Sequence, residues 1–307
     1  MPSKSRPSKS RPSKSRLPKS RALVDYAPAK VNLTLRVIGR RADGYHTLES
    51  IVVFAGVKDR LTFAPGKTLS LTVWGPNAAA AGATSDNLVL RAVRALAVEI
   101  DRLKLGRFTL TKNLPAAAGI GGGSSDAAAA LRLIARANRV KLTDPRLLRA
   151  AAKVGADVPV CVDPRARIMS GIGEVLSPRL RVPRFAAVLV NPGVAVPTKD
   201  VFAQLHRSER QPQPAAQARS VPGARAAFLK YLTRRANDLE AAAVEIAPDI
   251  AKVLAALQKT PGCEFARMSG SGATCFAFYP SARVAAAAAR SLSKQHKRWW
   301  VCATDLG

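Results

Sequence analysis

The chain has 307 residues, and 48% of them are hydrophobic, which predicts a globular protein with one large core or two ordinary ones. No uninterrupted apolar run approaches the ~20 residues that a membrane span needs. The four cysteines are scattered and form no CxxC pair, which argues against a zinc site and a disulfide framework. We therefore expect a reduced, cytoplasmic protein with no membrane partner.

The positive charge is divided between a short tail and the rest of the chain. Of the formal net charge of +29, residues 1–21 hold +8, in repeats of the unit PSKSR without an acidic residue. Such a segment buries too little apolar surface to offset its ordering entropy, so we expect a disordered basic tail. Organelle transit peptides share its composition but are amphipathic, so a solvated tail or an over-extended start is the simpler interpretation.

The remaining residues still carry +21, which suits a polyanionic ligand or a nucleic acid. Many of the arginines stand singly on predicted helices, as they do on solvated faces. The body of the chain has no interleaved basic and aromatic array, so we expect no specific nucleic-acid partner. Charge alone does not choose the ligand.

The first half of the chain predicts several strands and one helix. Residues 31–38 alternate between apolar and polar side chains, as a half-buried strand does. Further β-rich runs follow at 50–55, 60–64 and 69–74, and 77–85 is loop-like. Asp86 is the predicted cap of a helix with one apolar face, which consists of Val89, Ala92, Val93, Leu96 and Ile100.

The second half continues with alternating strands and helices. A strand at 107–112 leads into a glycine-rich segment and an alanine-rich helix that fades near Asn138, and Asp144-Pro145 opens another helix that Gly155 closes. The remaining predicted strands are 166–171, 185–191, 274–279 and 299–303. The remaining predicted helices are 237–259, with a restart at Pro248, and the one after Ser281; 206–224 reads as a mobile loop. This mixture predicts an α+β protein of two lobes, divided into 22–170 and 171–307 after the tail.

The segment NLPAAAGIGGGSSDAAAAL, residues 113–131, places glycines directly ahead of a helix. It contains no lysine, so it is not a Walker P-loop, and Ser124 stands where a dinucleotide fingerprint needs its third glycine. Gly121, Gly122 and Gly123 can adopt positive φ, and the free amides of a helix start favour an anion. The segment is therefore either a phosphate site built from main-chain amides or a flexible surface loop, and the glycines alone leave both open.

Four segments resemble the motifs of the GHMP kinases, the superfamily of galactokinase, homoserine kinase and mevalonate kinase. Residues 27–33 (APAKVNL) resemble the first motif and 115–125 the second. Residues 155–159 (GADVP) resemble the segment with the catalytic acid, and 268–276 (MSGSGATCF) resemble the third motif. The resemblance implies an N-terminal ATP-binding lobe and a C-terminal ferredoxin-like lobe, with the active site between them. It also implies ATP as co-substrate and Mg²⁺ as its companion.

Phosphorylation of an alcohol requires the hydroxyl to lose its proton as it attacks the γ-phosphorus. Asp157 is the candidate base, and Lys30 can stabilise the developing alkoxide. Lys30 and Asn32 project to the same side of an extended strand, so both can face one substrate. The triphosphate is expected along Pro115, Ala116, Ala117, Ala118, Gly119, Ile120, Gly121, Gly122, Gly123, Ser124 and Ser125.

Two features of this segment remain open. Members of the superfamily usually carry more glycine where this chain has three alanines, a departure that keeps the amides but can tighten the loop. Asp126 and Ser125 are possible Mg²⁺ ligands, while Asp126 can equally be a first-turn charge that supports the helix dipole.

Residues 42–48 (ADGYHTL) resemble the branch of the superfamily whose alcohol is a methylerythritol that carries cytidine diphosphate. This resemblance implies that Tyr45, His46, Thr198 and Phe202 bind the cytidine end, where aromatic rings stack on the pyrimidine; Phe202 can also be a core residue. Alternatives are a mevalonate or homoserine type of kinase, or a basic nucleic-acid-binding protein. We expect a monomer or a weak homodimer that acts on this small molecule.

Overall fold

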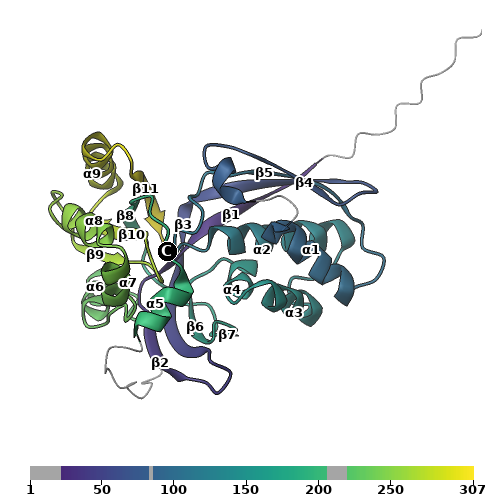
Figure 1. The fold of residues 1–307 in the computed structure, drawn as a ribbon, viewed down its shortest axis with the longest axis horizontal. Coiled ribbons are helices and arrows are strands. Elements are labelled where there is room, and N and C mark those ends of the chain that lie inside the picture. The colour runs from purple at the N-terminus through teal and green to yellow at the C-terminus, as the bar shows by residue number, and fades with distance from the viewer. Residues whose placement is uncertain (1–21, 83–85, 206–219) are drawn as a thin grey trace, which may run out of the picture.

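The computed structural model describes residues 22–82, 86–205 and 220–307, which form two lobes joined by β-sheet (Figure 1). Up to residue 176 the elements are β1 (Leu23–Asn32), β2 (Arg36–Arg40), β3 (His46–Pro65), β4 (Ser70–Trp74), the 3₁₀ helix η1 (Ala78–Ala81), α1 (Leu88–Glu99), β5 (Gly106–Thr111), α2 (Gly122–Asn138), α3 (Pro145–Val154), α4 (Val158–Val162), β6 (Arg167–Gly171) and β7 (Val175–Leu176). After it come β8 (Phe185–Asn191), α5 (Thr198–Leu205), α6 (Arg225–Thr233), α7 (Glu240–Ile246), α8 (Asp249–Gln258), β9 (Phe265–Met268), β10 (Cys275–Tyr279), α9 (Ala282–Gln295) and β11 (Trp300–Leu306).

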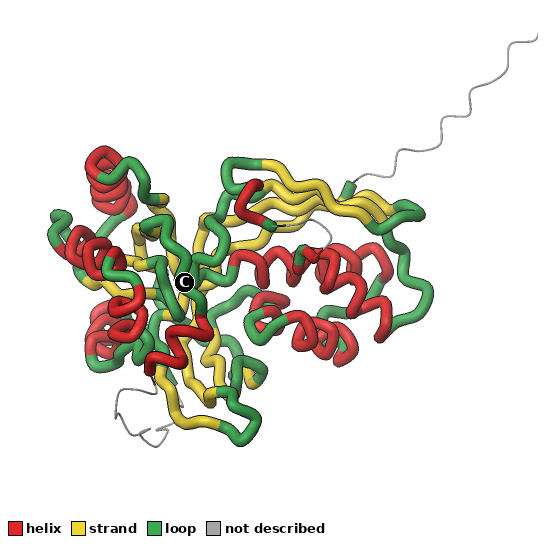
Figure 2. The backbone as a smooth tube through the Cα atoms, in the orientation of Figure 1, coloured by secondary structure: helices red, strands yellow, loops and turns green. Residues whose placement is uncertain are grey.

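The first lobe packs helices α1–α4 along one side of its strands (Figure 2). The long strand β3 pairs antiparallel with β1 and with β5, and β4 extends the sheet by running parallel to β5. The alanine run of α2 is buried among leucine, valine and phenylalanine side chains of the sheet and of α1. Because alanine is small, this helix approaches its neighbours closely, and its first turn is held firmly at the end of β1.

The second lobe has a sheet with the strand order β11-β8-β10-β9, in which every neighbouring pair is antiparallel. Two βαβ units interleaved in this order are the ferredoxin-like arrangement that the resemblance implies. Leu306 of β11 pairs with Ala55 of β3, so the sheet continues from one lobe into the other. The α+β, two-lobed prediction is confirmed.

Apolar side chains from both lobes meet in a shared cluster around three phenylalanines of the second lobe. Phe185 stacks on Phe278 with 4.2 Å between ring centroids, and Phe276 lies beside them. Ala29 of β1 and Ile51 of β3 belong to the same buried cluster. The end of β1 that contains the predicted site residues Lys30 and Asn32 therefore packs on side chains of both lobes.

Several predicted elements are confirmed, and two strand predictions are wrong. The strand expected over 31–38 breaks after Asn32, because the amide of Leu33 bonds to the carbonyl of Ile51 and the hydroxyl of Thr34 accepts the amide of Ile51. The runs 50–55 and 60–64 are one continuous strand, β3.

The cap predicted for the first helix is also wrong. Asn87, not Asp86, caps α1, since its side chain accepts the amide of Val89 at 3.0 Å. Helices α4 and α6, the short 3₁₀ helix η1 and strands β7 and β9 are not predicted by the sequence. The basic tail, part of the segment 77–85 and most of the 206–224 loop lie outside the described residues. Among the described helices, none combines the length and the apolar character of a membrane span.

Candidate active site

Lys30 lies at the end of β1, and its ammonium connects two other predicted site residues. Its Nζ donates to Oδ2 of Asp157 at 2.8 Å and to Oδ1 of Asn32 at 2.9 Å. The Lys30 side chain is buried, whereas that of Asp157, just ahead of α4, is 34% exposed. An ammonium has three protons, so one remains for a ligand that approaches from the exposed side of Asp157.

The amide of Asn32 is held by a chain of buried hydrogen bonds. Its Nδ2 donates to Oγ of Ser50 at 2.7 Å, and that hydroxyl donates to the carbonyl of Thr34 at 2.6 Å. The main-chain amide of Asn32 donates to Oγ of Ser269 at 3.1 Å, in the second lobe. These bonds leave the Asn32 oxygen facing Lys30. The sequence prediction that Lys30 and Asn32 point to one side of the strand is confirmed.

The main chain between β5 and α2 passes directly beside Lys30, and we call residues 115–121 the phosphate loop. The amide of Lys30 donates to the carbonyl of Ile120 at 2.9 Å. Gly121 has φ +59°, and a Cβ there would lie 3.1 Å from Cε of Lys30. Helix α2 then starts at Gly122, and no side chain caps its first turn. Free amides at the start of a helix, next to an ammonium, are suited to an anion.

Ser125 is held within the protein. Its hydroxyl donates to the carbonyl of Pro28 at 2.7 Å, and its amide donates to the carbonyl of Gly121 at 2.8 Å. Ser125 is fully buried, whereas Gly123 is exposed and Ser124 is half-buried. Ser125 therefore fastens α2 to β1, and the accessible part of the predicted ATP segment ends at Ser124.

A second glycine loop, residues 269–273, packs main chain to main chain against the phosphate loop. The amide of Thr274 donates to the carbonyl of Ala118 at 3.1 Å, and the hydroxyl of Ser269 donates to the carbonyl of Gly119 at 3.2 Å. A side chain at Gly119 would overlap the carbonyl of Gly272. The loop from the third motif therefore holds the backbone of residues 118 and 119 in place.

Asn237 supports the second glycine loop, a role that the sequence pattern does not reveal. Its Oδ1 accepts the amide of Leu239 just ahead of α7, and its Nδ2 donates to the carbonyls of Met268 and Gly270 at 3.0 and 2.8 Å. The only signal in the sequence is its position ahead of a helix, which does not point to a partner 33 residues away.

The residues predicted for the cytidine end come together from both lobes. His46, the first residue of β3, stacks on Phe202 of α5 with 4.6 Å between ring centroids and 15° between planes. The hydroxyl of Thr198 lies 2.8 Å from that of Ser271. Tyr45 precedes His46 in the chain and is 61% exposed. Phe202 also packs against the cores of both lobes, so it has the structural role considered for it as well.

Behind the phosphate loop lies a buried charge cluster that was not predicted. Nζ of Lys112 donates to Oδ2 of Asp59 at 2.5 Å and to Oδ2 of Asp126 at 2.6 Å. Asp126 thus faces an ammonium rather than a metal, and Ser125 is bonded to Pro28. The described residues contain no group of three or more His, Cys, Asp or Glu that could hold a metal ion. Ser125 and Asp126 therefore do not fit the role of Mg²⁺ ligands.

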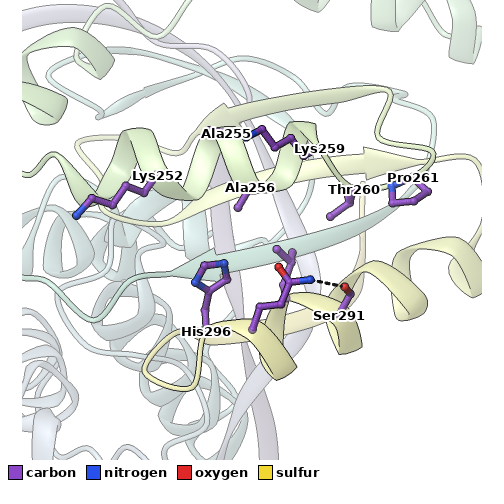
Figure 3. Close-up of a pocket in the computed structure, with 10 residues that line it drawn as sticks. Lys252, Ala255, Ala256, Lys259, Thr260, Pro261, Ser291 and His296 are labelled. Carbon is purple, nitrogen blue, oxygen red and sulfur yellow. Dashed lines mark hydrogen bonds between the residues drawn. The ribbon is translucent and has the colours of Figure 1, made fainter.

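A surface cavity of about 430 Å³ lies between α8 and α9 of the second lobe (Figure 3). Lys252 on α8 and Lys259 just after it line one side, and Ser291 on α9 and His296 just after that helix line the other. It shares no residue with the cluster around Lys30. The cavity is therefore separate from the predicted catalytic residues Lys30 and Asp157.

The chain matches known proteins along nearly all of its length. The family models described as GHMP kinases N terminal domain and GHMP kinases C terminal match residues 87–163 and 215–298. A 4-diphosphocytidyl-2-C-methyl-D-erythritol kinase of Rhodopseudomonas palustris (strain BisA53) is 53% identical and covers 93% of this chain and 98% of its own. One of Methylobacterium radiotolerans is 54% identical, with coverages of 92% and 99%.

Solved structures agree with these relatives. The crystal structure of a 4-(cytidine 5'-diphospho)-2C-methyl-D-erythritol kinase has a TM-score of 0.75 and 32% identity, and covers 93% of this chain and 100% of its own. A homoserine kinase from Cytophaga hutchinsonii has a TM-score of 0.68 at 18% identity, with coverages of 93% and 94%. The homoserine kinase is similar to this chain in fold alone.

Proposed function

This chain belongs to the 4-diphosphocytidyl-2-C-methyl-D-erythritol kinases of the GHMP superfamily, and on that premise we propose that Asp157 and Lys30 carry its chemistry. The reaction transfers the γ-phosphoryl group of ATP to the 2-hydroxyl of 4-diphosphocytidyl-2-C-methyl-D-erythritol. It gives the 2-phosphate and ADP, in the non-mevalonate route to isoprenoid precursors. The relatives give no support to the mevalonate, homoserine or nucleic-acid alternatives.

Asp157 is the proposed base for the substrate hydroxyl. Its carboxylate is partly exposed, and the Lys30 ammonium at 2.8 Å orients it. As the hydroxyl loses its proton, the third donor of Lys30 can turn to the alkoxide. The observation that supports this proposal most strongly is the Lys30 ammonium, which bridges Asp157 and Asn32 beside the start of α2.

The proposed place of the ATP triphosphate is the phosphate loop with the uncapped first turn of α2, residues 115–125 in all. The amides there are already oriented by helix geometry, so little reorganisation is needed when the phosphate charge arrives. Because the Ser125 hydroxyl and amide are bonded within the protein, we expect contacts from Gly122, Gly123 and Ser124 rather than from Ser125. Mg²⁺ is proposed to enter with ATP, held by phosphate oxygens and water, where it neutralises phosphate charge.

The proposed cytidine site is formed by Tyr45, His46, Thr198 and Phe202. The stacked rings of His46 and Phe202, and the exposed side chain of Tyr45 that precedes His46 in the chain, supply the aromatic surfaces for a pyrimidine. Since His46 belongs to β3 and Phe202 to α5, substrate binding at this place would touch both lobes. We also propose that the enzyme works in the cytoplasm, as a monomer or a weak homodimer.

The experiment that tests the function is a panel of alcohols with ATP and Mg²⁺, read by ADP release. We expect turnover with 4-diphosphocytidyl-2-C-methyl-D-erythritol and none above background with mevalonate or homoserine. The position of the new phosphate is read from the ³¹P and ¹³C spectra of the product. Turnover with mevalonate or homoserine at a comparable rate would contradict the proposal.

A further inference from the structure

Three charged side chains are buried together behind the phosphate loop. Lys112 follows β5, Asp59 lies within β3 and Asp126 lies on α2, and each has at most 3% of its surface exposed. The Lys112 ammonium bridges the two carboxylates at 2.5 and 2.6 Å. We call these three residues the buried cluster. The proposed chemistry at Lys30 and Asp157 makes no use of it.

The buried cluster joins the two ends of the phosphate loop. At the entry, Oδ1 of Asp59 accepts the amides of Asn113 and Leu114 at 2.5 and 2.8 Å. At the exit, Asp126 lies one turn into the helix that starts at Gly122. A Cβ at Gly122 would lie 3.3 Å from Nζ of Lys112, so the ammonium sits directly behind the first residue of α2.

We propose that Lys112 is a positioning residue for ATP, and that Asp126 takes up a proton when the triphosphate binds; this inference rests on the proposed function. Lys112 acts through Asp59 and Asp126, which fix the loop entry and the start of α2 relative to each other. In the proton step, an O–H bond forms on Oδ1 of Asp126 with a proton from solvent. The carboxylate becomes neutral, and no other bond changes.

The charges of the buried cluster supply the reason for proton uptake. Two ionised carboxylates and one ammonium leave a net charge of −1, and Oδ1 of Asp126 is buried without a hydrogen-bond partner. An excess negative charge that is buried in this way is costly, and protonation of one carboxylate removes the cost. A triphosphate on the other side of Gly122 adds further negative charge, which favours the neutral carboxyl.

The pKa values agree with this geometry. Burial raises the pKa of Asp126 most, the Lys112 ion pair lowers it and Asp59 raises it again, so that it lies at about 7. Burial alone would lower the pKa of Lys112, but the two carboxylates outweigh it and raise that pKa. The lysine therefore stays charged, and the titrating group near neutral pH is Asp126.

Other charged groups near α2 are already paired or turned away. Lys30 on β1 is paired with Asp157, and Arg132, further along α2, is paired with Asp25. Helix α1 buries apolar side chains and leaves its arginines exposed. On α4, burial raises the pKa of the Cys161 thiol to about 12, so it stays neutral. Within the described part of the chain, Lys112 and Asp59 are thus the charges that Asp126 meets.

The positioning role is tested with Lys112→Met, and Lys153→Met on the exposed end of α3 is the matched control. We expect the KM for ATP to rise about tenfold or more in Lys112→Met, while the KM for the alcohol changes less than about twofold. A general loss of structure would raise both values together. Equal KM values for ATP in Lys112→Met and wild type would overturn the positioning role.

Proton uptake is tested by titration calorimetry with a non-hydrolysable ATP analogue and Mg²⁺ at pH 7, in two buffers of different ionisation enthalpy. If the pKa of Asp126 rises by one unit, the wild type takes up about 0.4 proton more than Asp126→Asn, which keeps the shape of the side chain. The control Asp101→Asn, on an exposed turn, behaves as the wild type. The analogue's own titration is common to all three proteins and cancels.

The outcomes separate this inference from the proposed function. Analogue binding with the same proton uptake in wild type and Asp126→Asn overturns the proton step and leaves the kinase assignment standing. Failure of the wild type to bind the analogue contradicts the proposed function and this inference together. Thermal unfolding of each variant shows whether it is folded, and Asp126→Asn serves as the second variant if Lys112→Met does not fold.

Discussion

At the scale of single residues, the site depends on one ammonium that is shared between two oxygens. Lys30 is fixed by Asp157 and Asn32, and Asn32 is fixed in turn by Ser50. This arrangement sets the direction of Lys30 before substrate arrives, which lowers the cost of organising the transition state. The proposed cytidine end is less constrained, because Tyr45 is mostly exposed.

Tyr45→Ala is expected to raise the KM for the cytidylyl substrate by about tenfold, because one stacking surface for the base is lost. The KM for ATP should stay within about twofold of the wild type, since the phosphate loop is untouched. The measurement is steady-state kinetics with each substrate varied in turn. Tyr26 is another exposed tyrosine, and Tyr26→Ala is the control. Equal KM values for the cytidylyl substrate in both variants would contradict the stacking role of Tyr45.

Asp126 should also make stability depend on pH. Its pKa is about 7 in the folded protein and about 3.9 in an unfolded chain, so the folded state binds the proton more tightly. This residue's contribution to stability is therefore fully present below about pH 4 and is lost as the pH rises through about 7. Urea unfolding at pH 5.5 and pH 8 should show the wild type weakening relative to Asp126→Asn at the higher pH. A difference that is the same at both values would contradict the assignment.

The residues of the proposed site could be predicted from the sequence, whereas the residues that hold them in place could not. Lys30, Asn32 and Asp157 stand within recognisable motifs, and strand alternation places the first two on one side. Asp59 lies within a polar stretch that resembles a turn, and its partner Lys112 is 53 residues away. Nothing local distinguishes such a buried carboxylate from a surface one, so the buried cluster could not be predicted.

At the scale of elements, two glycine loops meet main chain to main chain in front of α2. Gly119 has φ +72° and faces the carbonyls of Gly272 and Ser269, so the contact has no room for a side chain. The contact joins the phosphate loop of the first lobe to the third motif of the second. It explains why a loop with few side chains can still have one conformation.

Gly119→Ala should therefore weaken ATP binding by about tenfold or more and lower the unfolding temperature, because the loops must separate to admit a methyl group. Gly82→Ala is the matched control, since Gly82 has a similar φ of +76°, and beyond its chain neighbours no described residue has an atom within 4 Å of the place that a Cβ would take. Analogue binding by calorimetry and thermal unfolding measure the two effects. Equal losses in both variants would show that backbone strain alone, rather than the loop contact, is responsible.

The missed elements also have physical explanations. The polar and glycine residues near Gly56 suggested a break in β3, but Gly56 is the point where β11 crosses, close to Thr304 and Asp305. Helix α6 buries only Phe228 and Leu232 of its nine residues, so its apolar pattern is weak. Both are decided by contacts with distant segments, which local sequence patterns do not contain.

At the scale of the whole molecule, the lobes share a sheet and an apolar cluster. Strand β11 lies between β8 and β3, and Leu306 at its end is buried in the cluster that also contains Phe185 and Ala29. The proposed division into 22–170 and 171–307 therefore separates two structural units that we expect to fold together. A rigid junction suits a site whose residues come from both lobes.

Leu306→Ala should lower the free energy of unfolding by about 2–4 kcal/mol, as other large-to-small changes in a core do. Unfolding should remain a single transition, because the cluster belongs to both lobes. Urea unfolding followed by circular dichroism and by tryptophan fluorescence measures both properties. Val98→Ala, at a largely exposed position, is the control and should be close to neutral. Two separated transitions in the wild type would contradict joint folding.

The most direct test of the whole account is a single-turnover experiment with Asp157→Asn, with ATP and 4-diphosphocytidyl-2-C-methyl-D-erythritol both saturating. We predict that the rate of phosphoryl transfer falls by about 10²–10⁴-fold, while the affinity for an ATP analogue stays within about threefold of the wild type. A rapid-quench measurement of labelled product gives the rate, and calorimetry gives the affinity. A transfer rate equal to that of the wild type would contradict the role of Asp157 and with it the proposed mechanism.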